Sequence, residues 1–209
     1  MLSMAPWMMP AAMPGAASGS TPVFGAWFAQ NGNGEMTGTA WIEESGQVEG
    51  PILLTNTHSV GVVRDAAIAW RVEHGGADES GYWWSLPVVA ETWDGHLNDI
   101  NGFHVTPAHV AEALQGATGG PVAEGNVGGG TGMICHELKG GIGTASRRVG
   151  EWTVGVLVQA NHGTRKLFEI SGVPVGQLLP GDDIFISAFA PPVIVFTAML
   201  PSMCVPSLK

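Results

Sequence analysis

The chain has 209 residues, of which 45% are hydrophobic, and its formal net charge is −10. This length and composition predict a globular protein with one large core, and the negative charge argues against binding to nucleic acid. The two cysteines, Cys135 and Cys204, form neither a disulfide framework nor a Cys-x-x-Cys metal motif, which is typical of a cytoplasmic protein.

The two ends of the chain differ in composition from its middle. Residues 1–20 are a mixture of Met, Ala, Pro, Gly and Ser without the positive start of a signal peptide, and we interpret them as a poorly ordered leader. Residues 183–209 are an apolar tail that four prolines interrupt. These prolines argue against a membrane-spanning helix, and a tail anchor stays open as an alternative.

Hydrophobic patterns predict the first elements after the leader. Residues 23–29 and 39–42 have the pattern of two short strands, and the Asn-Gly pairs of residues 31–34 favour a hairpin turn between them. Residues 52–55 predict a third strand. Apolar residues at spacings of three and four then predict a helix over residues 59–73, with Ser59 as its cap.

The second half of the chain predicts further elements of both kinds. Residues 86–92 have the pattern of a buried strand, and Thr106 followed by Pro107 predicts a helix that ends near Gly116. Residues 152–160 are apolar almost throughout and predict a strand covered on both faces. Strands and helices are therefore mixed, which indicates a layered α/β or α+β fold.

Residues 119–147 combine many glycines with apolar residues, which indicates a structured loop and strand system rather than a flexible linker. Two phosphate-binding motifs are absent from it. Met133 follows Gly132 where a P-loop needs a lysine, and Ser146 stands where a dinucleotide fingerprint needs its third glycine. Nucleotide binding is therefore not expected.

Polar residues at two strand ends are candidates for chemistry. Glu91, Trp93 and Asp94 follow a buried strand, and a carboxylate beside an aromatic ring suits a ligand's ammonium group. A solvated loop acid explains the same spacing equally well. Asn161 ends the strongest strand, where its amide could donate to an oxyanion or could be an ordinary turn residue.

Two other patterns suggest simpler roles. Residues 57–61 approximate the nucleophile elbow of hydrolases, but Thr57 replaces its first glycine, so we interpret the segment as a helix cap. The seven histidines never form the motif H-E-x-x-H, and Cys135 and His136 are adjacent rather than spaced for one ligand face. The sequence therefore predicts no metal and no other cofactor.

Six motifs in the middle of the chain resemble the DmpA family of peptidases, which comprises L-aminopeptidase/D-esterases and β-peptidyl aminopeptidases. They include NGNGEMTG, KGGIGTASR and QANHG, and they are long, specific and in order. The resemblance extends roughly over residues 23–176. The motifs occupy residues 31–38, 55–66, 88–105, 120–133, 139–147 and 153–163.

This resemblance implies an αββα sandwich of the N-terminal-nucleophile-like type. Family members are self-processing precursors that cleave themselves before a serine, whose hydroxyl then attacks the substrate carbonyl. By motif, Asn161 resembles the oxyanion-stabilising asparagine, Glu91 the acid that binds the substrate's amino terminus, and Trp93 an aromatic pocket residue. The implied activity is that of a serine aminopeptidase, acting on short peptides, amides or esters with a free amino group.

The chain departs from the family pattern near residue 182. Asp183 stands about where the nucleophilic serine is expected, and Ser187 is the candidate substitute. We therefore expect residues 21–182 to be the large-subunit part of a peptidase domain, between the leader and the tail. The loss of motifs at both ends suggests a truncated or frame-shifted member.

Two alternatives to an active cytoplasmic aminopeptidase stay open. The first is an inactive remnant, or a fragment without its small subunit, that keeps the ammonium pocket. The second is a membrane-associated protein that uses its apolar tail as an anchor. For the intact enzyme we expect a short peptide or amino-acid amide as substrate, a homo-oligomeric state, and no nucleic acid as partner.

Overall fold

The computed structural model describes residues 3–4, 22–75, 84–117, 119, 121–179 and 194–201. The predicted leader therefore lies outside the described residues, except for β1 (Ser3–Met4). Ser187 lies outside them as well. None of the helices in the described part of the chain is long and apolar enough to cross a membrane.

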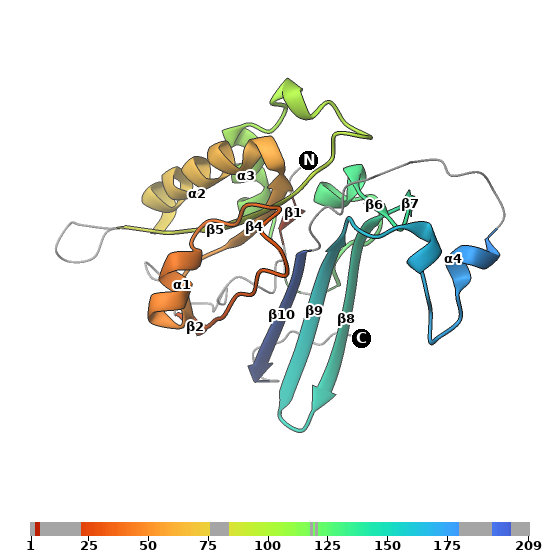
Figure 1. Cartoon of the computed structure of the whole chain (residues 1–209). Helices are drawn as coiled ribbons and strands as arrows, with labels where there is room; N and C mark the ends of the chain where they lie inside the picture. The colour runs from red at the N-terminus through yellow and green to blue at the C-terminus, as the bar shows by residue number, and fades with distance from the viewer. Residues whose placement is uncertain are drawn as a thin grey trace.

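The first sheet has the strand order β1-β4-β5, and its two longer strands are β4 (Ile52–Asn56) and β5 (Val88–Thr92). These two strands are parallel, and helix α2 (Val60–Gly75) connects them. Helix α2 packs with α3 (Pro107–Gln115) over one face of this sheet (Figure 1). The strands at 52–55 and 86–92 and both helices were predicted from the sequence, and their existence is confirmed.

The second sheet is antiparallel, with the order β10-β9-β8. Its strands are β8 (Gly141–Val149), β9 (Trp152–Ala160) and β10 (Ile194–Pro201). Strand β10 comes from the predicted tail and pairs with β9 over its whole length. This part of the tail is therefore a strand of the sheet.

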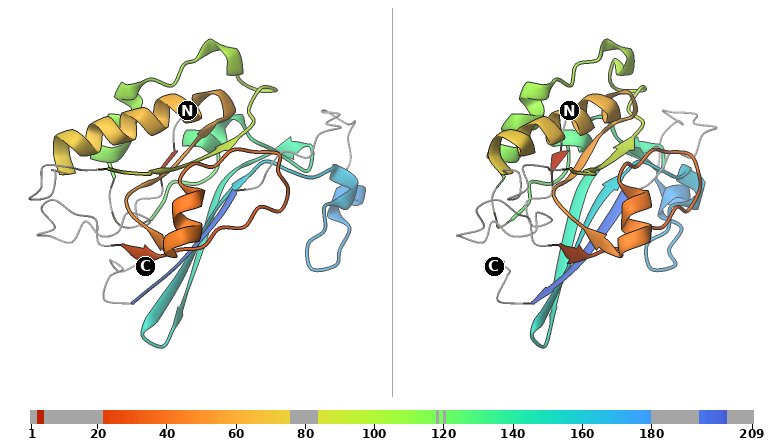
Figure 2. Two further views of the ribbon diagram at one scale, coloured as in Figure 1. Left: turned by 60° about the vertical axis from the view of Figure 1, so that its left-hand side comes forward. Right: turned by 90° about the vertical axis from the view of Figure 1, so that its left-hand side faces the viewer.

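The two sheets pack face to face, on the side of the first sheet opposite the helices (Figures 1 and 2). Alternation along β4 and β5 creates this arrangement, because successive side chains point to opposite faces. Leu53 packs beneath the helices, whereas its neighbour Leu54 contacts the second sheet at Ile142 and Leu157. The described residues thus form helix, sheet and sheet layers, and the predicted α/β class is confirmed.

The predicted hairpin near the start of the chain is wrong. Residues 39–42 belong to helix α1 (Thr39–Ser45), which lies between two left-handed glycines, Gly38 and Gly46. Each glycine turns the backbone where a strand would have to continue. Strand β2 (Val23–Phe24) pairs instead with β3 (Gln47–Val48), which follows the helix. The buried side chain of Ile42 then packs with those of Val48 and Val88.

The expectation that β9 is covered on both faces is only partly correct. Leu157 and Gln159 are buried between the sheets, whereas Trp152 at the start of β9 is exposed and the remaining residues of the strand are half-buried. Full burial within the described layers is therefore limited to one face near the end of the strand.

The glycine-rich segment is compact, as predicted. It forms the 3-10 helix η4 (Gly128–Gly132) and a short hairpin of β6 (Ile134–Cys135) and β7 (Leu138–Lys139). A Cβ at Gly130 would lie 2.5 Å from the Gly125 carbonyl oxygen, so the backbones approach too closely for a side chain. Lys139 Nζ fixes this packing by donating to the carbonyls of Gly130, Met133 and Gly140 at 3.0, 3.1 and 2.7 Å.

The remaining elements are short. Two 3-10 helices precede the longer helices in the chain: η2 (Thr57–Ser59) precedes α2, and η3 (Ile100–Gly102) precedes α3. After β9 come η5 (Arg165–Leu167) and helix α4 (Val175–Leu178). Ser59, predicted as a cap, is buried in η2 immediately before α2 begins.

Candidate functional site

The candidate site lies where β5 ends, beside the ends of β4 and β9. Glu91 is the penultimate residue of β5, Trp93 follows that strand, and Asn161 follows β9. All five residues of β5 are buried, so the strand carries its polar end into the interior. The structure thus brings together three of the four site residues expected from the sequence. The fourth, Ser187, lies outside the described residues.

Glu91 is a carboxylate held inside the protein, with 2% of its surface exposed. One carboxylate oxygen accepts a hydrogen bond from the Thr57 hydroxyl at 2.5 Å, and the other accepts one from the backbone N–H of Glu35 at 3.0 Å. Burial raises the pKa of Glu91 above its usual value, although these two hydrogen bonds lower it. The carboxylate is therefore oriented, but it is poorly solvated when ionised.

The charges that act on Glu91 are those of two other carboxylates, Glu35 and Asp94, and both raise its pKa. Asp94 is also buried, with its oxygens accepting from the amides of Asn56 at 3.3 Å and Asn98 at 2.9 Å. A cation that enters this region would relieve the repulsion and compensate the buried charge. The electrostatics therefore favour a positively charged ligand group next to Glu91.

Trp93 follows Glu91 by two residues and supplies an aromatic surface at this end of β5. Its ring is 38% exposed, lies against Gly95 and meets the His96 ring edge-on at 4.7 Å between centroids. A Cβ at Gly95 would lie 2.7 Å from the indole, so the glycine makes room for this position. An exposed indole at the same strand end as a buried acid suits the apolar part of a small ligand that carries an ammonium group.

Asn161 is fixed on both sides of its amide. Its Oδ1 accepts from the backbone N–H of Ile134 at 3.0 Å, and its Nδ2 donates to the backbone carbonyl of Trp93 at 2.7 Å. The side chain is 2% exposed. An amide nitrogen carries two N–H groups, so the second one is the donor that an oxyanion would require. The bond to Trp93 also connects Asn161 directly to the segment that bears Glu91.

Strand alternation explains why Asn161 faces the end of β5. Leu157, Gln159 and Asn161 point to the same side of β9, toward the first sheet. Gln159 confirms that direction, because its Nε2 donates to the Thr92 hydroxyl at 2.5 Å. The side chain of Thr92 lies on the face of β5 that meets the second sheet. The two sheets are therefore joined by a buried hydrogen bond one residue from Glu91.

Two features of this region were missed in the sequence. Thr57 was interpreted as part of a helix cap, but its hydroxyl donates to Glu91. The sequence pattern also did not indicate that Cys135 and His136 lie together, whereas a tight turn brings both of them beside His162. Only the parallel pairing of β4 with β5 could have indicated the first contact, since it places Thr55 opposite Glu91.

Thr57 gives a direct test of the orientation of Glu91. We expect Thr57→Val to weaken the binding of an amino-acid amide by about tenfold, because the ionised carboxylate loses a hydrogen bond worth roughly 1.5 kcal/mol or more. Calorimetric titration with the amide measures the change. Thr57→Ser, which keeps the hydroxyl, is the matched control and should bind as the parent chain does. Equal affinity in the valine and serine variants would contradict this role.

Comparison with known proteins gives consistent matches. The model of the family described as Peptidase family S58 matches residues 11–187. The chain is 55% identical over 177 residues to the β-peptidyl aminopeptidase BapA of Sphingosinicella microcystinivorans, covering 82% of this chain and 43% of that protein. The chain therefore spans less than half of this relative.

Solved structures agree with this result. A Burkholderia sp. β-aminopeptidase superposes with a TM-score of 0.76 at 53% identity, over 85% of this chain and 49% of that one. The L-aminopeptidase D-Ala-esterase/amidase of Ochrobactrum anthropi, a serine aminopeptidase with a variant of the Ntn hydrolase fold, superposes with a TM-score of 0.78 at 46% identity, over 90% of this chain and 52% of that one. The expected N-terminal-nucleophile-like fold is confirmed.

Proposed function

The chain belongs to peptidase family S58, and from that membership we propose that it acts as an aminopeptidase. The proposed substrates are short peptides, amides or esters with a free amino terminus. The observation that carries the proposal is the buried, doubly hydrogen-bonded carboxylate of Glu91, which lies near the charges of two other carboxylates, Glu35 and Asp94. An N-terminal ammonium group is the complement that this site requires.

In the proposed reaction, some residues of the site bind the substrate and others take part in the chemistry. The substrate's ammonium group binds the Glu91 carboxylate, and its first side chain lies against Trp93. A serine hydroxyl attacks the scissile carbonyl, and the second N–H of Asn161 donates to the oxygen that becomes negative. Collapse of this intermediate expels the amine or alcohol, and water then releases the amino acid from the serine ester.

The nucleophile of the proposed reaction is a serine. The family resemblance places a serine at a self-cleavage point, and we propose Ser187 as its substitute in this chain. The Ochrobactrum anthropi relative is called a prototype of the serine aminopeptidases, which supports a serine at this step. A cytoplasmic location and a homo-oligomeric state remain part of the same proposal.

The test combines intact mass with hydrolysis by the purified chain. Substrates are p-nitroanilides of one α- and one β-amino acid, each with its N-acetylated counterpart as the control. We expect hydrolysis only of the free-amine forms, two fragments from cleavage before Ser187, and loss of both in Ser187→Ala. Cleavage elsewhere, or retained turnover in Ser187→Ala, would contradict Ser187 as the nucleophile. Hydrolysis of the N-acetylated substrates would contradict the proposed aminopeptidase activity.

A second function fits the same geometry, since Glu91, Thr57 and Trp93 lie within the described residues whereas Ser187 lies outside them. The chain would then be a substrate-binding part without hydrolysis of its own. Calorimetric binding of an amino-acid amide to an uncut chain that shows no turnover would establish this alternative. Absence of both binding and turnover would contradict both functions.

A further inference from the structure

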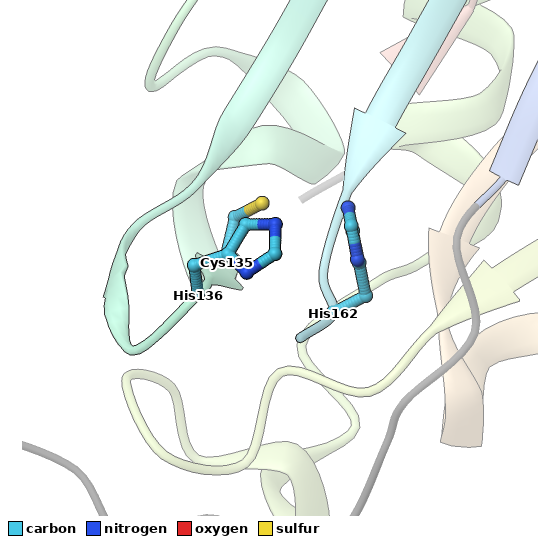
Figure 3. A group of neighbouring side chains, drawn as sticks. All are labelled: Cys135, His136 and His162. Atoms are coloured by element: carbon cyan, nitrogen blue, oxygen red, sulfur yellow. The ribbon is translucent and has the colours of Figure 1, made fainter. Parts of the chain in front are cut away.

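Cys135, His136 and His162 form a cluster of metal-ligating side chains beside the candidate site. One ligand atom from each residue lies within 4.8 Å of the others, and all three side chains are half-buried. Figure 3 shows the Cys135 sulfur and the ring of His136 on one side, with the ring of His162 facing them from the end of β9. Residues far apart in the sequence therefore converge here.

A tight turn brings the two adjacent residues to one side. His136 and Glu137 both have positive φ, 52° and 61°, and they form the two-residue turn between β6 and β7. Strand alternation does not hold inside such a turn, so His136 does not point away from Cys135 as an extended residue would. The backbone N–H of His136 also donates to the carbonyl of His162 at 2.6 Å, which fixes the distance between the two segments.

The ring of His136 is held in place by its neighbours. It stacks on Phe168 at 5.0 Å and meets the ring of His162 edge-on at 4.8 Å between centroids. Gly163 has a φ of 81°, and a Cβ there would lie 2.5 Å from His136 Nδ1. The glycine therefore allows both the backbone turn after Asn161 and the close position of the ring.

The hydrogen bonds leave the correct ring nitrogen for a metal. His136 Nδ1 lies 3.1 Å from the carbonyl oxygen of Thr164. A carbonyl can only accept, so Nδ1 carries the proton and Nε2 keeps its lone pair. Metal-binding histidines commonly donate their other N–H to a carbonyl, which fixes the orientation of the ring. His136 already has this arrangement.

The ligand types of the cluster also suit a cation. Metals bind the neutral imidazole of histidine and the thiolate of cysteine, and a divalent metal removes the proton from a coordinating thiol. Cys135, His136 and His162 offer one sulfur and two imidazole rings within 4.8 Å of one another.

We propose that Cys135, His136 and His162 form a binding site for a thiophilic divalent cation, with Zn²⁺ as the expected ion. One sulfur and two imidazole nitrogens suit zinc, whereas Mg²⁺ and Ca²⁺ prefer oxygen ligands. Ligand atoms around tetrahedral zinc lie about 3.3–3.7 Å apart. The side chains would therefore close by roughly 1 Å on binding, with the fourth position left for water.

This site would connect the two segments that hold Asn161. Cys135 follows Ile134, whose backbone N–H donates to Asn161 Oδ1, and His162 follows Asn161 itself. A cation bound to both segments would restrain them at the point where the candidate oxyanion donor lies. Metal binding does not depend on the proposed hydrolysis, so each proposal can fail without the other.

Cobalt provides a spectroscopic test on the full, reduced and metal-free chain. We expect Co²⁺ to give a thiolate-to-cobalt charge-transfer band with intense tetrahedral d–d bands, and Zn²⁺ to displace them. Cys135→Ser should abolish the charge-transfer band, and His162→Gln should weaken cobalt binding by at least about tenfold. Cys204→Ser and His104→Gln are the controls, and they should leave the spectrum unchanged. A spectrum without a thiolate band, or one that Cys135→Ser retains, would overturn the proposal.

A second measurement needs no variant and therefore does not depend on folding of the mutants. The chain is alkylated with and without Zn²⁺, and the rate at each cysteine is followed by peptide mass mapping. We expect Zn²⁺ to slow alkylation of Cys135 at least tenfold and to leave Cys204 unchanged. Equal rates at Cys135 with and without Zn²⁺ would overturn the site.

Discussion

Glu91→Gln is expected to weaken binding of an amino-acid amide by about 30- to 1,000-fold, because losing one partner of a buried charge pair costs roughly 2–4 kcal/mol. Glutamine keeps the shape and one acceptor oxygen, which can serve the Glu35 N–H, while its NH2 group can only donate, for example to the Thr57 hydroxyl oxygen. It has no charge to offer to an ammonium group. Calorimetric titration measures the affinity. The same titration with a ligand that lacks the amino group should show no difference between the variants.

The pH dependence follows from the raised pKa of Glu91. Below that pKa the carboxyl is neutral, so affinity for the amide should rise as pH increases through it, above the ordinary glutamate range. The rise should end where the ligand's own amino group loses its proton, near pH 8. This rise in affinity on the acidic side of the pH profile, its acidic limb, should disappear in Glu91→Gln. A limb that persists in the variant would show that another group controls binding.

The free energy of unfolding of the ligand-free chain should fall over the pH range in which the affinity for the amide rises. Because the pKa of Glu91 is higher in the folded state than in the unfolded state, the folded state binds more protons between the two values. Without ligand, the contribution of Glu91 to the free energy of unfolding therefore falls as pH rises from the unfolded pKa through the folded one. Glu91→Gln should remove this loss and unfold at a higher temperature at pH 7. Glu43→Gln, at an exposed position of α1, is the control and should have little effect.

Asn161→Ala is the second substitution with a large expected effect. If the chain hydrolyses p-nitroanilides, we expect kcat to fall by about 10²- to 10³-fold, because removing one oxyanion donor costs roughly 3–4 kcal/mol. KM should change much less, since this donor acts mainly in the transition state. The substitution also removes the bonds to Ile134 and Trp93, so circular dichroism must show that the variant is folded.

Asn161→Asp distinguishes the role of the side-chain N–H donor of Asn161 from that of its acceptor oxygen. Aspartate keeps an oxygen for the backbone N–H of Ile134, but when ionised it can donate no hydrogen bond to an oxyanion or to Trp93. Both Asn161→Ala and Asn161→Asp should therefore have a strongly reduced kcat. Activity in the aspartate variant similar to that of the parent chain would show that Asn161 positions Ile134 and does not stabilise the reaction.

The strands and helices with strong local patterns could be predicted from the sequence. The apolar runs of β4, β5 and β9 and the start of α3 at Pro107 each depend on residues close together in the chain. The segment at 39–42 could not be assigned in this way, because its four residues suit a strand as well as a helix. The left-handed turns at Gly38 and Gly46 and the burial of Ile42 decide the outcome.

The sequence alone determined the family, the α/β class, and the positions of Glu91, Trp93 and Asn161 at strand ends, because motifs and periodicity depend only on order along the chain. Tertiary structure decided which groups contact one another. Parallel pairing of β4 with β5 places Thr57 against Glu91, and the turn at His136 brings Cys135 and His136 to one side, where both face His162. Such contacts depend on strand register and on left-handed turns, and neither can be obtained from local spacing.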